Sequence, residues 1–203
     1  YHGVGFGGIS VGGIPYNRAA FGQLLPDVDH LPHTHNLEHN AFKRGMPEWG
    51  GHLADDLERI IYLHDPSNVA AVIVEPISGS TGVLPPPMGY LQRLREICDK
   101  HGVLLIFDEV VTGFRVGPGG AQAFFGVQAD IASYGKVLGG GLPIGAIAGK
   151  AKFMDALDGG YWQFGDDSVP PVGVTYFAGT FVRHPLGLAA AHAVLNHLKE
   201  KGP

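Results

Sequence analysis

The chain has 203 residues, of which 45% are hydrophobic and 16% are charged, a balance typical of a folded domain rather than a disordered segment. Its formal net charge is −5, and its lysines and arginines are scattered, so neither a nucleic-acid-binding face nor a basic membrane patch is expected. No apolar run approaches the length of a membrane span. The single cysteine, Cys98, excludes an internal disulfide framework and favours a reducing, cytoplasmic location.

The first half of the chain predicts a helix followed by a strand. Apolar residues at positions 53, 57, 60 and 61 recur at helical spacing, with acidic residues on the opposite side, and predict an amphipathic helix over 53–64. The sequence Asp-Pro-Ser-Asn at 65–68 favours a turn. The continuous apolar run 69–74 then predicts a fully buried strand, which Pro76 ends.

A second helix and a second strand follow the three prolines at 85–87. An apolar stripe between Tyr90 and Cys98 predicts a helix with Gly102 at its C-terminal cap, and the run 103–107 predicts another buried strand. A strand, a helix and a strand at this spacing indicate a βαβ unit, with parallel strands and a right-handed crossover.

The remaining elements complete an α/β architecture. Short strands are predicted at 131–134 and 144–148, and Pro185 begins a last helix that extends through Leu198. The predicted fold is a mostly parallel sheet with helices on both faces.

Acidic residues close both predicted strands of the βαβ unit. Glu75 follows the first strand, and Asp108 and Glu109 follow the second. Polar residues often mark strand exits, but the carboxyl ends of parallel strands are also where such sheets bind ligands. Two acids at one edge, followed along the chain by a lysine framed by glycines, favour a functional site.

That lysine is Lys136, which follows the strand predicted at 131–134. Gly135 and the glycines at 139–141 are expected to leave room for a flat group beside its amine. A phosphate-binding P-loop would need glycine at position 130 and serine or threonine at 137, where the chain has Asp130 and Val137.

The pair Lys136 and Asp108 suits an aldehyde cofactor such as pyridoxal phosphate. A partly desolvated lysine can lose its proton and form a Schiff base near neutral pH. The cofactor ring also needs a carboxylate beside its nitrogen, because the protonated ring is the electron sink. Asp108, at a predicted strand end 28 residues before Lys136, is the candidate.

The sequence resembles the class III pyridoxal-phosphate aminotransferases of fold type I over essentially its whole length. The most specific segments are Phe-Asp-Glu-Val-Val-Thr-Gly-Phe-Arg at 107–115, Gly-Gly-Ala-Gln at 119–122 and the glycine-rich segment 135–145. The resemblance implies that residues 1–203 form part of the large cofactor-binding domain. The phosphate loop of the family would precede the first residue and the small domain would follow the last, so the isolated segment is expected to be inactive.

The resemblance also implies roles for individual residues. Lys136 would hold pyridoxal 5'-phosphate as a Schiff base and then shuttle a proton, while Asp108 would pair with the pyridine nitrogen. Val110 would pack on one face of the ring and Tyr1 on the other. The other expected cofactor-binding residues are His2 and Gly3 of the Tyr-His-Gly motif, Glu75, and Thr180, which would cross to the neighbouring site of a homodimer.

An amino donor and an oxo-acid acceptor are the partners that this resemblance implies. Related enzymes that act on ornithine or γ-aminobutyrate have a glutamate where this chain has Ser80 and a glutamine where it has Val111, so those substrates are disfavoured. Residues 1–90 resemble ω-amino-acid:pyruvate aminotransferases. From Thr112 onward the chain resembles glutamate-semialdehyde aminomutases and the aminotransferase domains of peptide and polyketide synthases.

Several alternatives stay open. An aminomutase, a lyase or a racemase on this fold would use the same lysine and aspartate. Residues 3–8 match the G-x-G-x-x-G pattern of dinucleotide-binding oxidoreductases, although no strand precedes them and 11–15 cannot continue as a helix. The histidines at 30, 33, 35 and 39 lie in a predicted loop without a complete ligand set, so no metal site is expected. A non-catalytic fragment is the last alternative.

Overall fold

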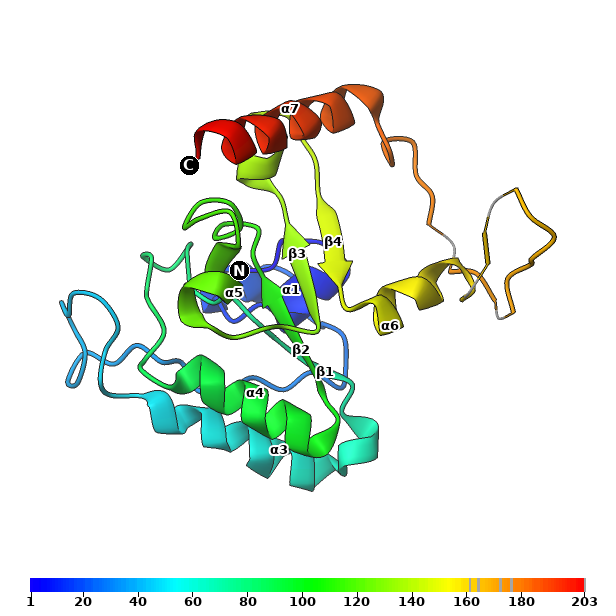
Figure 1. The fold of residues 1–203 in the computed structure, drawn as a ribbon. Coiled ribbons are helices and arrows are strands. Elements are labelled where there is room, and N and C mark those ends of the chain that lie inside the picture. Colours follow the sequence, from blue (N-terminus) through cyan, green and yellow to red (C-terminus); the bar gives the residue numbers. More distant parts are fainter. Residues whose placement is uncertain (161, 164, 172, 176, 203) are drawn as a thin grey trace.

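The sheet of this protein has four strands in the order β1-β2-β3-β4 (Figure 1). The structure is a computed structural model that describes residues 1–160, 162–163, 165–171, 173–175 and 177–202. Strands β1 (Ala71–Val74), β2 (Leu104–Asp108) and β3 (Ile131–Tyr134) are parallel, and β4 (Ala146–Gly149) runs antiparallel to β3. The expected α/β fold with a mostly parallel sheet is confirmed.

The longer predicted helices are present near their expected positions. Helix α3 (Asp56–His64) follows the 3-10 turn η1 (Gly51–Asp55), which takes the place of the first turn predicted from position 53. Helix α4 (Tyr90–His101) ends at Gly102, whose φ of 70° allows its N–H to bond to the carbonyl of Cys98. Helix α7 (Pro185–Lys201) begins at the expected proline.

Short helices that the sequence did not predict connect these elements. The α-helices are α1 (Phe6–Val11), α2 (Pro15–Ala19), α5 (Gly120–Phe125) and α6 (Ala151–Met154), and the 3-10 turns are η2 (Pro66–Asn68), η3 (Lys136–Gly139) and η4 (Asp155–Asp158). Several are rich in glycine or only about one turn long, so they show no apolar stripe of the kind that marks a longer helix.

The main core lies between the sheet and the pair α3 and α4, which lie side by side on one face of it (Figure 1). Leu105 and Phe107 of β2 point into this core and are fully buried, as are Leu94 and Cys98 of α4. The alternation of side chains along a strand directs Asp108 to the opposite face. There it meets the N-terminal segment of the chain, which continues into α1.

The prediction that the run 69–74 forms a fully buried strand was wrong. Strand β1 begins at Ala71, which is exposed, and its other three residues are only half-buried. Among the described residues, β1 has a neighbouring strand on one side only, and a groove of 1130 Å³ runs along it. Strand β2, between two neighbours, alternates between fully buried and half-buried residues. A run of apolar residues does not by itself distinguish an edge strand from a central one.

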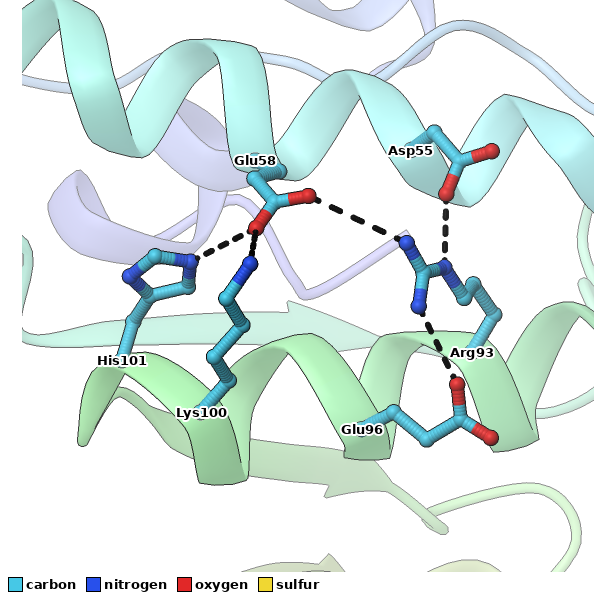
Figure 2. A network of polar contacts seen from close by, with 6 residues as sticks. All are labelled: Asp55, Glu58, Arg93, Glu96, Lys100 and His101. Atoms are coloured by element: carbon cyan, nitrogen blue, oxygen red, sulfur yellow. Dashed lines mark hydrogen bonds and ion pairs between the residues drawn. The ribbon is translucent and has the colours of Figure 1, made fainter.

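Charged side chains join the outer surfaces of α3 and α4 (Figure 2). The carboxylate of Glu58 accepts hydrogen bonds from Lys100 at 2.5 Å and His101 at 2.9 Å. Arg93 bonds to Asp55 at 2.6 Å. The hydrogen bond from Lys100, together with that from His101, lowers the pKa of Glu58 to about 2. These contacts tie the two helices together outside the apolar core.

Among the described residues, no helix is long and apolar enough to cross a membrane.

Candidate active site

The candidate residues meet at the carboxyl edge of the three parallel strands. Glu75 follows β1, Asp108 ends β2, and Lys136 comes two residues after β3. The register pairs Val74 with Phe107 and Asp108 with Ser133, so the three strand ends lie level with one another. This is the edge at which parallel sheets bind their ligands.

Asp108 is held at this edge by three hydrogen-bond donors. Its Oδ2 accepts a hydrogen bond from Nδ1 of His2 at 2.7 Å. Its Oδ1 accepts bonds from the N–H of Val110 at 3.0 Å and from Oγ of Ser133 at 3.2 Å. Burial alone would raise the pKa of Asp108, but these bonds, that from His2 foremost, lower it on balance below its usual value. The carboxylate is therefore ionised at neutral pH although its residue is only 9% exposed.

Glu75 connects the end of β1 to the N-terminal segment. Its Oε2 accepts the N–H of Gly79 at 3.0 Å, and its other oxygen contacts the backbone nitrogen of Tyr1. A Cβ at Gly79 would lie 3.4 Å from Val111 and 3.6 Å from the Glu75 carboxylate. The loop after β1 therefore folds closely over the loop after β2. The contact with Glu75 brings Tyr1, and His2 directly after it, close to the end of β1.

Lys136 is exposed and begins the 3-10 turn η3 with a φ of 44°, in the left-handed region that non-glycine residues seldom adopt. Gly135 lies directly beside Val110, since a Cβ at this glycine would be 3.4 Å from Cγ1 of that valine. Within the described residues the Lys136 ammonium forms no ion pair. Lys136 and Val110 thus lie at the same edge as Asp108.

Two of the three glycines at 139–141 make close packing contacts. A Cβ at Gly140 would lie 2.7 Å from Val194 of α7, and one at Gly139 would lie 3.0 Å from Ile144. These two glycines let η3 pack closely against α7 and the following loop. A Cβ at Gly135 would lie 3.4 Å from both Val110 and the carbonyl oxygen of Ile144, whereas one at Gly141 would meet no atom within 4 Å.

Thr180 lies in an exposed turn that precedes α7. The turn is closed by the N–H of Val182, which bonds to the carbonyl of Gly179 at 3.1 Å. Its expected contact is with the site of a second subunit, so its role stays a prediction.

Two residues of the site were not singled out from the sequence. Ser133, in the strand before Lys136, bonds to Asp108 on the ligand side. Gly8 of α1 packs against the Tyr-His-Gly segment, since a Cβ there would lie 2.3 Å from the carbonyl oxygen of His2. The alternation of the strand could have identified Ser133, but no sequence signal marked Gly8.

The rival sites do not form. Residues 3–8 match a dinucleotide-binding pattern, but α1 begins inside the pattern, at Phe6, and ends before Gly12, as the sequence indicated. Among the described residues, no cluster of histidine, cysteine or acidic side chains could hold a metal ion. His39 instead stacks on Trp49, with 4.6 Å between the ring centroids.

Comparison with known proteins identifies the family of the chain. The family model for class III aminotransferases matches residues 1–202. The chain is 56% identical over 202 residues to an omega-aminotransferase of Caulobacter vibrioides, covering 98% of this chain and 44% of that protein. It is 50% identical over 203 residues to a beta-alanine–pyruvate aminotransferase of Pseudomonas aeruginosa, covering 98% of this chain and 43% of that protein.

A solved structure supports the same relationship. The omega transaminase from Pseudomonas jessenii in complex with PMP superposes with a TM-score of 0.79 at 29% identity, over 99% of this chain and 43% of that one. The fold and these matches thus place the chain among the class III aminotransferases. The chain belongs to this family, and it spans somewhat less than half the length of the curated relatives named above.

Proposed function

We propose that residues 1–203 are part of the cofactor-binding large domain of a pyridoxal-phosphate-dependent aminotransferase, which moves an amino group from an amine or amino acid to an oxo acid. The observation that carries this proposal is the Asp108 carboxylate, held by three hydrogen-bond donors at the same strand edge as Lys136. Family membership supports it over a lyase, a racemase or a dinucleotide-dependent oxidoreductase.

The residues present fit pyridoxal 5'-phosphate. Its ring nitrogen needs a nearby carboxylate that stays ionised, and Asp108 is such a group because its hydrogen bonds outweigh its burial. Its aldehyde needs a primary amine, and the Lys136 ammonium is not engaged with an acid among the described residues. When bound, the cofactor supplies an electron sink for bond breaking at the substrate carbon.

The side chains of this chain would then have separate tasks. His2 orients Asp108 and keeps it ionised through its bond to Oδ2. Lys136 holds the cofactor and then accepts and returns the proton that moves on the substrate, as a general base and acid. Val110 and Tyr1 would flank the ring. Gly3, with a φ of 92°, lets the chain turn away after His2 toward α1.

Similarity favours a terminal amine as donor. The two curated relatives are named for ω-amino substrates, and one acts on β-alanine and pyruvate according to its name. Glutamate-1-semialdehyde 2,1-aminomutases also match, at 40% identity over 173 residues for that of Acetivibrio thermocellus, covering 79% of this chain and 38% of that protein. Since that identity is lower, we place the aminomutase second and propose transfer from an ω-amino acid to pyruvate.

We also propose that the full protein is a cytoplasmic homodimer in which Thr180 reaches the cofactor phosphate of the partner. The exposed position of Thr180, in a turn before α7, supports a contact with another subunit. The buried, free thiol of Cys98 supports a reducing compartment.

The test uses the full-length protein purified with pyridoxal phosphate. Mixing it with β-alanine and pyruvate should produce alanine, and Lys136→Ala should abolish this transfer together with the visible absorbance band of the lysine-bound cofactor. Lys152→Ala, at another exposed lysine, is the matched control and should leave both unchanged. Conversion of glutamate-1-semialdehyde without an added oxo acid, in place of transfer, would favour the aminomutase.

A further inference from the structure

The buried side chain of Glu109 has no task in the site described above. It is fully buried, on the face of β2 opposite to Asp108. Its Oε2 accepts the N–H of Ala121 at 2.6 Å and the hydroxyl of Thr112 at 3.1 Å, and its Oε1 accepts the N–H of Gln122 at 3.3 Å. Within the described residues it forms no ion pair, so these donors must offset the cost of burying it.

The Gly-Gly-Ala-Gln motif at 119–122 is shaped around this carboxylate. A Cβ at Gly120 would lie 2.3 Å from Oε2 of Glu109, and this glycine has a φ of 60°. Ala121 is fully buried. The motif therefore encloses Glu109 at the start of α5, which explains a conspicuous sequence feature that the cofactor site leaves unexplained.

Gln122 extends the network from Glu109 to β3. Its side-chain Oε1 accepts the N–H of Ala129 at 2.9 Å, and its Nε2 donates to the hydroxyl of Tyr134 at 3.1 Å. Both ends of the amide are thus occupied, which fixes its orientation. The ring of Tyr134 packs against Phe114, with centroids 5.6 Å apart. Tyr134 precedes Lys136 by two residues.

The ends of β2 and β3 are therefore joined on both faces of the sheet. On the ligand side, Ser133 bonds to Asp108. On the opposite side, Gln122 connects the loop that encloses Glu109 to Tyr134. Between them, the N–H of Glu109 bonds to the carbonyl of Ser133 at 2.9 Å. Movement of one strand end past the other would break bonds on both faces.

We propose that Gln122 is a positioning residue, which acts through Tyr134 to set where Lys136 stands relative to Asp108. This inference rests on the proposed function, because it concerns the lysine and the carboxylate that would hold the two ends of the cofactor. A small displacement of such groups is enough to slow a reaction strongly without abolishing binding.

The test uses the full-length holoenzyme with the variants Gln122→Leu, Tyr134→Phe and the double variant. Each should keep the visible band of the lysine-bound cofactor but shift its pH midpoint, and each should lower kcat by roughly 10- to 100-fold with little change in KM. The kcat of the double variant should equal that of Gln122→Leu, because both changes break the same hydrogen bond between Gln122 and Tyr134. In the cofactor-free protein, amide hydrogen exchange at 134–137 should become faster.

The matched control is Gln92→Leu. Gln92 also bonds to α5, donating to the carbonyl of Phe125 at 3.0 Å, but it is exposed and does not contact β3. It should leave the midpoint, kcat and exchange unchanged.

Three outcomes would overturn the inference. In the first, Gln122→Leu and Tyr134→Phe each retain the wild-type pH midpoint and kcat. In the second, their effects on kcat add in the double variant. In the third, Gln92→Leu shifts the midpoint as much as Gln122→Leu does. Tyr134→Phe removes only one oxygen atom, so it decides the matter should Gln122→Leu fail to fold. A wild-type protein with no visible band would instead refute the proposed function, and this inference with it.

Discussion

The imidazole of His2 lies against the carboxylate of Asp108, with 2.7 Å between Nδ1 and Oδ2, although 106 positions separate the two residues in the sequence. Because a carboxylate cannot donate, the imidazole must carry its proton on Nδ1. This contact joins the N-terminal segment to the end of β2. It also makes the charge state of Asp108 depend on a residue outside the sheet.

We therefore expect His2→Ala to weaken cofactor binding by about 10-fold at neutral pH, since a hydrogen bond to a charged group is lost. The pKa of Asp108 is lowered in the wild type, so the ionised form is lost only when the pH falls below its usual range. Without His2, burial should raise the pKa of Asp108. The pH below which the cofactor no longer binds, the acidic limit, should therefore be higher in His2→Ala. Titrating pyridoxal phosphate into full-length apoprotein across a pH series measures both effects.

His197→Ala, an exposed histidine of α7, is the control for that experiment. If His2→Ala and the control have equal affinities and equal acidic limits, His2 does not lower the pKa of Asp108.

Gly8 is predicted to place His2. A Cβ at Gly8 would lie 2.3 Å from the carbonyl oxygen of His2, whereas one at Gly7 of the same helix meets no atom within 4 Å. Alanine favours a helix over glycine by about 1 kcal/mol, so Gly7→Ala should be neutral or slightly stabilising. Gly8→Ala should instead displace His2 and reduce cofactor affinity toward that of His2→Ala. Equal affinities for the two alanine variants would contradict this account of Gly8.

Gly120 is predicted to be required by the Glu109 carboxylate. Gly120→Ala and Gly126→Ala both place a Cβ at a positive φ, of 60° and 66° respectively. Only the first would collide with Glu109, since nothing lies within 4 Å of a Cβ at Gly126. Gly126→Ala should cost about 1 kcal/mol of the free energy of unfolding, and Gly120→Ala distinctly more. Denaturant unfolding of the full-length apoprotein compares them, and equal losses would argue against a tight enclosure of Glu109.

Asp130 should make stability depend on pH. Burial would raise the pKa of Asp130, but hydrogen bonds from Lys150, the backbone of Leu105 and Arg95 lower it to about 2. A lowered pKa in the folded state stabilises the protein above the unfolded value of 3.8, and this contribution disappears as the pH falls toward 2. Asp130→Asn should therefore cost about 2 kcal/mol at pH 7, and the difference from wild type should shrink below pH 4.

Asp99→Asn is the control for Asp130, because Asp99 also bonds to Arg95, at 2.8 Å, but its side chain is 65% exposed. Its loss should change the free energy of unfolding by less than about 1 kcal/mol. A pH-independent difference between wild type and Asp130→Asn would contradict the assigned pKa shift.

The sequence predicted those parts of the fold in which apolar residues recur with a clear pattern. Helices α3 and α4 show a complete apolar stripe. Strand β2 is a continuous apolar run that follows the cap of α4 at Gly102 and ends at the polar residue Asp108. Helices α1 and α5 carry glycines and no stripe, so only tertiary contacts show why they form. The edge position of β1 was likewise hidden, because pairing partners are not encoded in a single strand.

The site was predicted in part from the residues and in part from resemblance. The strand-end rule alone brought Glu75, Asp108 and Lys136 to one edge, and the structure places them there. The rule could not separate Asp108, the last residue of β2, from Glu109, which follows it and is enclosed by the loop at 119–122. The roles of Tyr1 and His2 came from the resemblance, since no local pattern connects position 2 with position 108.

We expect Lys136 to bind the cofactor covalently. The most direct test is borohydride reduction of the full-length protein loaded with pyridoxal phosphate, followed by protease digestion and mass spectrometry. We expect the reduced pyridoxyl phosphate on the peptide that contains Lys136, and no such peptide from Lys136→Ala. Attachment to another lysine, or no attachment in the wild type, would contradict it.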